Sequence, residues 1–164
     1  MTKIPIISIV GRSGCGKTTL LENLIPELKK RNFRVGTIKH HAHLGFEIDH
    51  PGKDTWRHAQ AGSDHVVIAA PDKIASIKRL KDRLSLDEIA LSMADVDIIL
   101  TDGYQSAGKP AIEVIRATNG KKPICQPEQL IAVASDIVLS IDTPQFELND
   151  YSGIIDMVVD KYLS

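Results

Sequence analysis

Apolar and polar residues follow two different patterns along this chain. Short runs rich in isoleucine and valine are typical of buried strands, whereas apolar residues spaced three or four positions apart are typical of helices. The runs predict strands at residues 4–10, 33–39, 64–70, 73–80, 96–100, 111–117, 129–134 and 137–141. The helical spacing predicts helices at residues 18–30, 53–61, 85–93 and 149–163, the last capped by Asn149 or Asp150.

Strands that alternate with helices predict an α/β fold with a mainly parallel sheet. Only Pro71 and Asp72 separate the expected strands at 64–70 and 73–80, so these two should form a hairpin that adds an antiparallel piece. The chain of 164 residues is the length of a single domain, and we expect one domain over residues 1–164.

A glycine-rich loop joins the first expected strand to the first expected helix. Its residues match the phosphate-loop pattern G-x-x-x-x-G-K-[ST] without a gap: Gly11, Arg12, Ser13, Gly14, Cys15, Gly16, Lys17 and Thr18. In this pattern the backbone N–H groups cradle the α/β-phosphates, the lysine reaches the β/γ-phosphates and the last hydroxyl ligates Mg²⁺. Strand, loop and helix also place the helix dipole against the phosphates. The pattern predicts nucleoside triphosphate binding and a P-loop NTPase three-layer sandwich, with Lys17 as a catalytic residue.

A magnesium–phosphate site needs a second acidic group at the end of a strand beside the P-loop strand. Asp102 follows the apolar run Ile98-Ile99-Leu100 and precedes Gly103, which would let the backbone approach the γ-phosphate. We therefore predict that Thr18 and Asp102 bind the metal, and that Asp102 is a catalytic residue together with Lys17. The alternative is a capping or turn aspartate, and Asp97 is the less direct candidate.

The segment from Asp49 to Thr55 follows the second expected strand and carries charged residues on a Pro-Gly turn. Such a turn can sense a γ-phosphate or a second ligand. Lys53 could meet an anionic group and Asp54 could bind metal-linked water. The alternative is that Asp54 or Thr55 only caps the following helix.

The choice of base has the weakest sequence signal. The guanine-reading tetrapeptide N-K-x-D is absent, but Asp136 follows a late strand, where such a motif would lie. Its carboxylate could accept hydrogen bonds from guanine N1 and N2. A turn aspartate at the end of a strand is an equally good interpretation.

All six histidines fall between His40 and His65. A metal site would use His40, His41 and His43, but their spacing matches no standard zinc site and no cysteine joins them. A solvated or phosphate-facing loop is the favoured interpretation.

Composition narrows the class of protein. A net charge of −1 gives no case for nucleic acid or an anionic membrane surface, and no apolar run approaches the roughly 18 residues that span a bilayer. A disulfide between Cys15 and Cys125 would tie up the phosphate loop, so we expect two free thiols and a cytoplasmic location.

Several motifs together resemble the MobB family, the molybdopterin-guanine dinucleotide biosynthesis adapter proteins. Besides the P-loop and the Asp102-Gly103 pair, the motifs are Thr37-Ile38-Lys39-His40, Pro51-Gly52-Lys53-Asp54-Thr55, Gln60-Ala61-Gly62 and Ile131-Ala132-Val133-Ala134-Ser135-Asp136. The resemblance runs over nearly the whole chain, and the K-H pair followed by P-G-K-D-[ST] is its most specific part.

The resemblance implies a GTP-binding protein with weak GTPase activity. Such proteins assist the guanylyltransferase MobA in attaching GMP to molybdopterin, and they are typically homodimers. Carried over to this sequence, the resemblance implies that phosphate and magnesium are bound by Gly14, Gly16, Lys17, Thr18 and Thr19. The acidic group at the end of a strand would be Asp102, followed by Gly103. The switch turn would contain Lys53 and Asp54. The family often has Glu where this chain has Asp102, and the shorter side chain would reach the metal through water.

Two other functions remain open. A P-loop small-molecule kinase using ATP would hold its acceptor in the loop from His40 to Asp54 and would need an arginine-rich lid. The residues that could form such a lid are Lys78, Arg79, Lys81 and Arg83. A metal-delivery GTPase would use the histidines instead. In the favoured adapter hypothesis hydrolysis is slow, because no residue is clearly placed to orient water and no arginine finger is evident. An edge strand of the hairpin at 64–80 is a candidate dimer surface.

Overall fold

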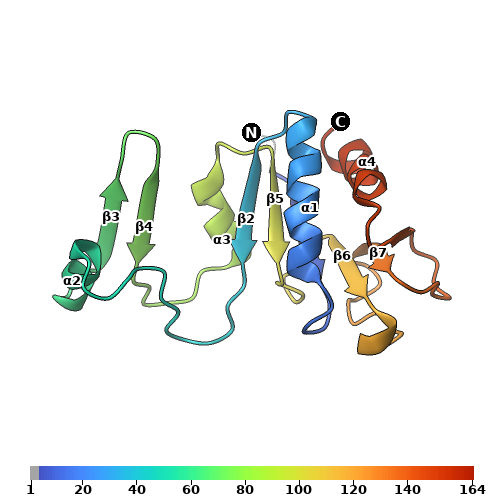
Figure 1. Ribbon diagram of the computed structural model, residues 1–164, viewed down its shortest axis with the longest axis horizontal. Coiled ribbons are helices and arrows are strands. Elements are labelled where there is room, and N and C mark those ends of the chain that lie inside the picture. The colour runs from blue at the N-terminus through green and yellow to red at the C-terminus, as the bar shows by residue number, and fades with distance from the viewer. Residues whose placement is uncertain (1–3) are drawn as a thin grey trace. The chain divides into compact units, whose positions relative to one another are not determined.

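The computed structural model describes residues 4–164. The chain divides into two compact units. The first runs as far as His40 and resumes over Leu86–Ser164, and the second is His41–Ser85. Each unit is built around its own sheet (Figure 1).

The first unit contains a six-stranded, wholly parallel sheet in the order β2-β5-β1-β6-β7-β8. Its strands are β1 (Ile6–Val10), β2 (Val35–Lys39), β5 (Ile98–Asp102), β6 (Ala111–Ile115), β7 (Leu130–Ser135) and β8 (Gln145–Glu147). Every residue of β1, β5 and β6 is buried, as expected for central parallel strands covered on both faces. In Figure 1 the arrows of β2, β5 and β6 point to one edge, so their carboxyl ends meet there.

Helices cover both faces of this sheet. α1 (Lys17–Lys30) and α4 (Tyr151–Tyr162) pack against each other on one face, where their apolar stripes join alternate residues of the central strands, such as Ile7, Ile9 and Leu100. The intervening strand residues Ile6 and Ile99 face the other way. There they pack with α3 (Leu86–Ala90) and the 3₁₀ turn η1 (Leu91–Met93). The predicted α/β architecture with three layers is confirmed.

The second unit is smaller and barely buried. It contains α2 (Asp54–Gln60) and an antiparallel hairpin of β3 (His65–Ala69) and β4 (Ile74–Lys78), with α2 packed against β3. The predicted hairpin is therefore confirmed. Val66 is the one apolar residue described as buried in this unit, whereas Ile68 and Ile74 are 57% and 73% exposed.

One predicted strand is wrong. Residues 137–141 form an irregular loop, and the edge strand β8 lies further along the chain. The backbone N–H and C=O of Leu139 bond the side-chain amide of Gln145, both at 2.8 Å, and leave no ladder partner for a strand. Ile137, Leu139 and Ile141 instead pack against Ile115 and Val133, whereas Val138 is exposed.

The terminal helix and the cysteines agree with expectation. Asp150 caps α4 by accepting a hydrogen bond from the Gly153 N–H at 3.0 Å, which settles the choice between the two candidate caps. Cys15 and Cys125 are buried free thiols. Over residues 4–164, every helix is too short or too polar to cross a bilayer.

Candidate nucleotide-binding site

The glycine-rich loop lies between β1 and α1, where the carboxyl ends of the central strands meet. Gly11 has a φ of 143°, and a Cβ there would lie 2.6 Å from the Val114 carbonyl oxygen and 2.7 Å from the Cys15 sulfur. Only glycine fits such a position. Gly16 precedes α1 in a left-handed conformation with a φ of 102°. The first turn of α1 contains no acidic residue, so the positive end of its dipole faces the loop uncompensated.

Lys17 and the two threonines after it open α1 at the mouth of this loop. The Lys17 ammonium donates to the carbonyl oxygens of Gly11 at 3.0 Å and Arg12 at 2.9 Å, so its charge lies over the loop. Thr18 and Thr19 lie in the first turn of the helix, where backbone N–H groups have no helical acceptor. This arrangement of donors and positive charge can bind a polyphosphate.

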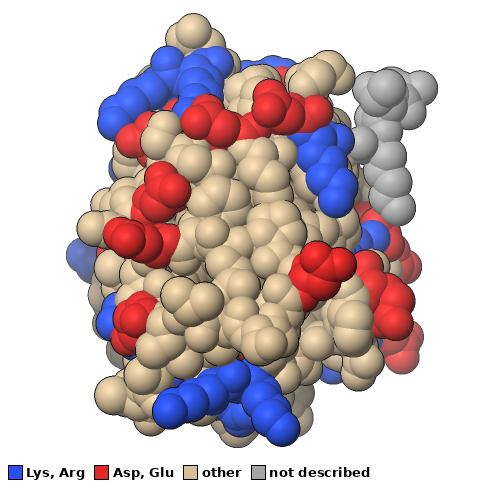
Figure 2. Space-filling model, turned by 90° about the vertical axis from the view of Figure 1, so that its right-hand side faces the viewer, with Lys and Arg blue, Asp and Glu red and all other residues tan. Residues whose placement is uncertain are grey.

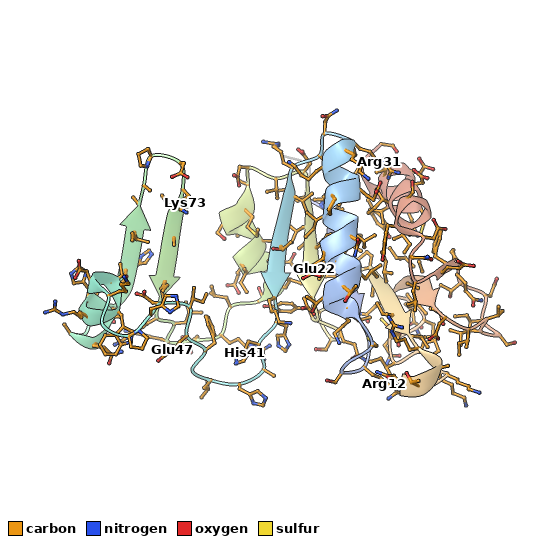
Figure 3. All side chains as sticks on the ribbon, viewed as in Figure 1. Arg12, Glu22, Arg31, His41, Glu47 and Lys73 are labelled. Carbon is orange, nitrogen blue, oxygen red and sulfur yellow. The ribbon has the colours of Figure 1, made fainter. Side chains whose placement is uncertain are left out.

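The loop after β6 supports the P-loop from the side. Arg116 donates from Nε to the Cys15 carbonyl oxygen at 2.8 Å, and the Asn119 amide donates to the Ser13 carbonyl oxygen at 2.9 Å. Asn119 closes the 3₁₀ turn η2 (Ala117–Asn119). Figure 3 labels Arg12 at this end of α1, away from Arg31 at its far end. Sequence reasoning did not find these supports, because about a hundred residues separate each donor from its acceptor.

Arg12 belongs to a basic edge of the first unit. Arg12, Arg116 and Lys122 line one small hollow beside the P-loop. Figure 2 shows lysine and arginine gathered along its lower margin, the edge at which β5 and β6 end in Figure 1. The edge carries positive charge next to the loop predicted to hold phosphates.

A buried carboxylate anchors the same supporting loop. Glu113 on β6 is 1% exposed and accepts hydrogen bonds from the backbone N–H groups of Ile124 and Cys125, at 2.8 and 3.0 Å. Burial raises the pKa of the Cys125 thiol, and the neighbouring Glu113 carboxylate raises it further. Cys125 therefore serves as an apolar packing residue here rather than as a thiolate.

Asp102 ends β5 beside the start of α1. Its side chain is 9% exposed, and its Oδ2 accepts a hydrogen bond from the Thr18 hydroxyl at 3.4 Å. The ammonium of Lys39 lies 2.5 Å from the same oxygen. The N–H of the next residue, Gly103, donates to the Ile9 carbonyl oxygen at 2.9 Å and holds the turn against β1. Asp102 thus closes a strand, as predicted, and Asp97 lies at the opposite end of that strand.

The donor set fits a magnesium ion. Mg²⁺ prefers oxygen ligands at about 2.0–2.1 Å in an octahedron, in which neighbouring ligand oxygens are roughly 3 Å apart. The Thr18 hydroxyl and the Asp102 carboxylate are such oxygens, and they are 3.4 Å apart. The two residues named from the sequence as metal ligands are therefore brought together.

An open cavity of about 700 Å³ adjoins the P-loop. Its lining includes Gly16 and Thr19 from the start of α1, Arg116 after β6, and Asp136 after β7. One Asp136 carboxylate oxygen accepts a hydrogen bond from the Ala117 N–H at 2.8 Å, which holds the side chain at the rim. This volume lies within the range of small-molecule sites.

The second predicted acidic turn belongs to the other unit. Lys53 immediately precedes α2 and makes no side-chain cap, and Asp54 is the first residue of that helix. Asp49 accepts from the His50 N–H, and a hydrogen bond from Thr55 holds the pKa of the Asp49 carboxyl below its usual value. The roles of Lys53 and Asp54 in nucleotide binding stay predictions.

The histidines form no obvious metal site. The rings of His41 and His43 meet edge to face with centroids 5.8 Å apart, and His41 meets Phe46 in the same way. Within residues 4–164, no group of three or more His, Cys, Asp or Glu side chains could hold a metal ion.

Comparison with known proteins decides the family. The sequence profile described as "MobB: Molybdopterin guanine dinucleotide synthesis protein B" matches residues 6–136, which include the P-loop, Asp102 and Asp136. The chain belongs to the MobB family. A MobB relative from Haemophilus influenzae, a molybdopterin-guanine dinucleotide biosynthesis adapter protein, is 36% identical over 159 residues, 95% of this chain and 88% of the relative. The adapter protein of the same name from Escherichia coli is 35% identical over 165 residues, 97% and 94% of the two chains.

Solved MobB structures share the fold. The crystal structure of a molybdopterin-guanine biosynthesis protein B superposes with a TM-score of 0.74 at 30% identity, over 94% of this chain and 98% of that chain. The structure of MobB from Bacillus subtilis superposes with a TM-score of 0.75 at 22% identity, over 96% and 98%. The predicted family and the predicted P-loop NTPase fold are confirmed. None of these named relatives is described as a kinase.

Proposed function

We propose that this protein is a GTP-binding adapter with weak GTPase activity. It assists a MobA-type guanylyltransferase in converting molybdopterin to its guanine dinucleotide form. The observation that carries the proposal is the intact P-loop with Thr18 and Asp102 converging beside it, in a chain of the MobB family. Both units, residues 1–164, act as one GTP-binding domain in the cytoplasm.

The P-loop backbone and Lys17 bind the triphosphate. The N–H groups of the loop and of the first turn of α1 donate to phosphate oxygens. The Lys17 ammonium turns from its own loop carbonyls to the β- and γ-phosphates. Thr18 and Asp102 would hold Mg²⁺, which would supply positive charge to the phosphates. Gly103 would let the backbone come close to the γ-phosphate.

The nucleoside occupies the cavity beside the loop. The wall from Gly16 to Thr19 belongs to the phosphate site and to the cavity at once, so a bound triphosphate leads its ribose and base into that space. Asp136 also lines this cavity, with one oxygen held by the Ala117 N–H. Its other oxygen can accept from guanine N1 or N2, a pair of donors that adenine lacks.

Hydrolysis by the adapter alone is slow. In the described residues 4–164, the charged group in contact with the Asp102 carboxylate is the Lys39 ammonium. An ammonium donates hydrogen bonds and cannot accept a proton from attacking water. Slow hydrolysis is the rate that the MobB resemblance implies. Lys53 and Asp54 in the second unit respond to the γ-phosphate or present the nucleotide to the partner enzyme.

Calorimetric titration of the purified protein with GTP·Mg²⁺ and ATP·Mg²⁺ tests the proposal. We expect GTP to bind more tightly, and Lys17→Ala to weaken binding by roughly 30- to 150-fold, since a charged hydrogen bond is worth about 2–3 kcal/mol. Lys29→Ala removes an exposed lysine at the far end of the same helix and is the matched control.

Three outcomes contradict the proposal, and the third is measured by repeating the titration with an Asp136→Leu variant. Near-normal GTP affinity in Lys17→Ala would remove the P-loop assignment. A preference for ATP, with phosphate transfer to a metabolite, would favour the small-molecule kinase. An unchanged ratio of GTP to ATP affinity in Asp136→Leu would remove Asp136 as the base reader.

A further inference from the structure

Two neighbouring strands end in residues of opposite charge beside the P-loop. Lys39 is the last residue of β2, and its register partner Asp102 is the last residue of β5. Register partners in a parallel pair point to the same face of the sheet. The Lys39 ammonium lies 2.5 Å from Asp102 Oδ2, the shortest of the salt bridges described in residues 4–164.

The same carboxylate oxygen also receives the Thr18 hydroxyl. Thr18 Oγ1 is 3.4 Å from Asp102 Oδ2, so a hydroxyl from α1 and an ammonium from β2 converge on one atom. The P-loop lysine does not share this position, because the Lys17 ammonium bonds the carbonyls of Gly11 and Arg12. The positive charge that neutralises Asp102 therefore comes from β2.

The two partners of this pair differ sharply in exposure. The Asp102 side chain is 9% exposed, whereas the Lys39 side chain is 68% exposed. A nearly buried carboxylate without a cation is costly, so Lys39 offsets the cost of burying Asp102 before metal binds. The long, exposed Lys39 stem can swing into solvent with little loss of packing.

We infer that Lys39 is a resident counter-cation that competes with Mg²⁺ for Asp102. This inference rests on the proposed function, since it needs Mg²⁺ to bind between Thr18 and Asp102. The Lys39 ammonium contacts Oδ2 and would repel a divalent ion that approaches the same carboxylate, so metal binding favours displacement of Lys39. Lys39 thereby lowers the affinity of the nucleotide-free protein for divalent cations and makes metal binding depend on the phosphates.

The exchange takes place where the chain leaves the sheet. Lys39 is followed by His40, whose ring lies against Tyr104 with centroids 4.8 Å apart, and the second unit begins at the next residue. Displacement of Lys39 would act on the backbone next to His40, the last residue before the second unit. Lys39 thus acts through Asp102, as a positioning residue of the metal site.

Binding of Mn²⁺, a paramagnetic substitute for Mg²⁺, to the nucleotide-free protein tests the inference by electron paramagnetic resonance. We expect Lys39→Gln to bind Mn²⁺ about tenfold or more tightly than wild type, because a contacting charge changes the affinity of a carboxylate for another cation by about that factor. Lys39→Arg keeps the charge and should bind as weakly as wild type. Adding Asp102→Asn to Lys39→Gln should abolish the gain.

Arg34→Gln is the matched control. Arg34 precedes β2 and forms a 2.7 Å ion pair with Asp97, which precedes β5, so this pair joins the same two strands at their opposite ends. Breaking it changes the net charge equally and should leave Mn²⁺ affinity unchanged. An equal gain in Arg34→Gln would mean that net charge alone explains the effect and would overturn the inference.

A readout in the wild-type protein covers the case in which Lys39→Gln does not fold. Saturating Mg²⁺ should shift the side-chain NMR signal of Lys39 in lysine-labelled protein and leave that of Lys29 in place. An unshifted Lys39 signal, or equal Mn²⁺ affinity in folded Lys39→Gln and wild type, overturns the inference. Calorimetry with GTP on the same wild-type sample separates the two claims, because loss of GTP binding contradicts the proposed function whatever Lys39 does.

Discussion

Two aspartates at opposite ends of β5 have different surroundings and therefore different expected chemistry. Asp102 is nearly buried and meets Lys39 and the Thr18 hydroxyl beside the P-loop. Asp97 is partly exposed and pairs with Arg34, with its Oδ1 2.7 Å from the guanidinium and its Oδ2 2.7 Å from the Arg34 N–H. The proposed exchange of a cation for a metal ion therefore concerns Asp102, whereas Asp97 joins two strands.

The Arg34–Asp97 pair makes stability depend on pH in a defined window. Hydrogen bonds from the Arg34 side chain and backbone lower the pKa of Asp97 from 3.8 to about 2. A carboxyl whose pKa falls on folding stabilises the protein above its unfolded value, and that stability is lost as the pH falls through the folded value. The difference in unfolding free energy between wild type and Asp97→Asn should be constant above about pH 5 and disappear toward pH 2.

Urea unfolding at each pH measures this difference. The effect should be small, because both side chains are solvent-accessible. In an Arg34→Met background the same comparison should give a smaller difference that is lost nearer the ordinary pKa of aspartate. A difference that stays constant from pH 5 to pH 2 would contradict the assigned cause.

At the scale of elements, the loop after β6 connects the sheet to the P-loop. It holds the P-loop carbonyls through Arg116 and Asn119, and its far end is tied to β6 by Glu113. A loop that carries several polar groups needs such partners, since an unpaired buried N–H group costs about 1–3 kcal/mol. The P-loop is thereby positioned from two sides, by α1 and by this loop.

Removing the Glu113 anchor should affect stability and nucleotide binding together. Glu113→Leu leaves the N–H groups of Ile124 and Cys125 without their acceptor, so we expect a loss of about 2–3 kcal/mol in unfolding free energy. GTP affinity should fall several-fold because the P-loop loses support. Denaturant unfolding and calorimetry measure the two effects, with the exposed Glu128→Leu as control. Reduced stability with full GTP affinity would show that the loop does not position the P-loop.

At the scale of the whole molecule, the second unit is poorly buried by itself. A two-stranded hairpin is marginally stable alone, and both outer edges of the β3–β4 sheet lack a described strand neighbour in residues 4–164. Isoleucines lie exposed on both of its faces, among them Ile68 and Ile74. We expect this unit to form the homodimer contact that the MobB resemblance implies, because open edges and exposed apolar residues favour pairing.

Light scattering coupled to size exclusion tests the dimer. The wild type should have twice the 18.0 kDa mass of one chain, and Ile74→Lys should shift it to monomer. Leu91→Lys, a change at an apolar residue of the first unit that is 80% exposed, is the control and should leave the dimer intact. Dimeric Ile74→Lys protein, or monomeric wild type, would contradict the assignment.

Site residues could be predicted from the sequence where a motif and its supporting residues are close together along the chain. The P-loop and Asp102 were found because each combines a short motif with an adjacent apolar run. Glu113, Arg116 and Asn119 carry no local signal, since their partners are chosen by the packing of the loop after β6. The apolar run at 137–141 gave a false strand, because Ile137, Leu139 and Ile141 pack in a small buried cluster while Gln145 satisfies the Leu139 backbone.

Periodicity and motif spacing are properties of neighbouring residues, and they determined the α/β class, the hairpin and the phosphate loop. Tertiary structure decided what lies next to what. It set the strand order β2-β5-β1-β6-β7-β8 and brought Thr18 to Asp102, 84 positions away. It also placed Lys39 on the same carboxylate. Parallel strands pair across long crossovers and in a register that no local pattern encodes, so the partner of Asp102 became known only when β2 and β5 were aligned.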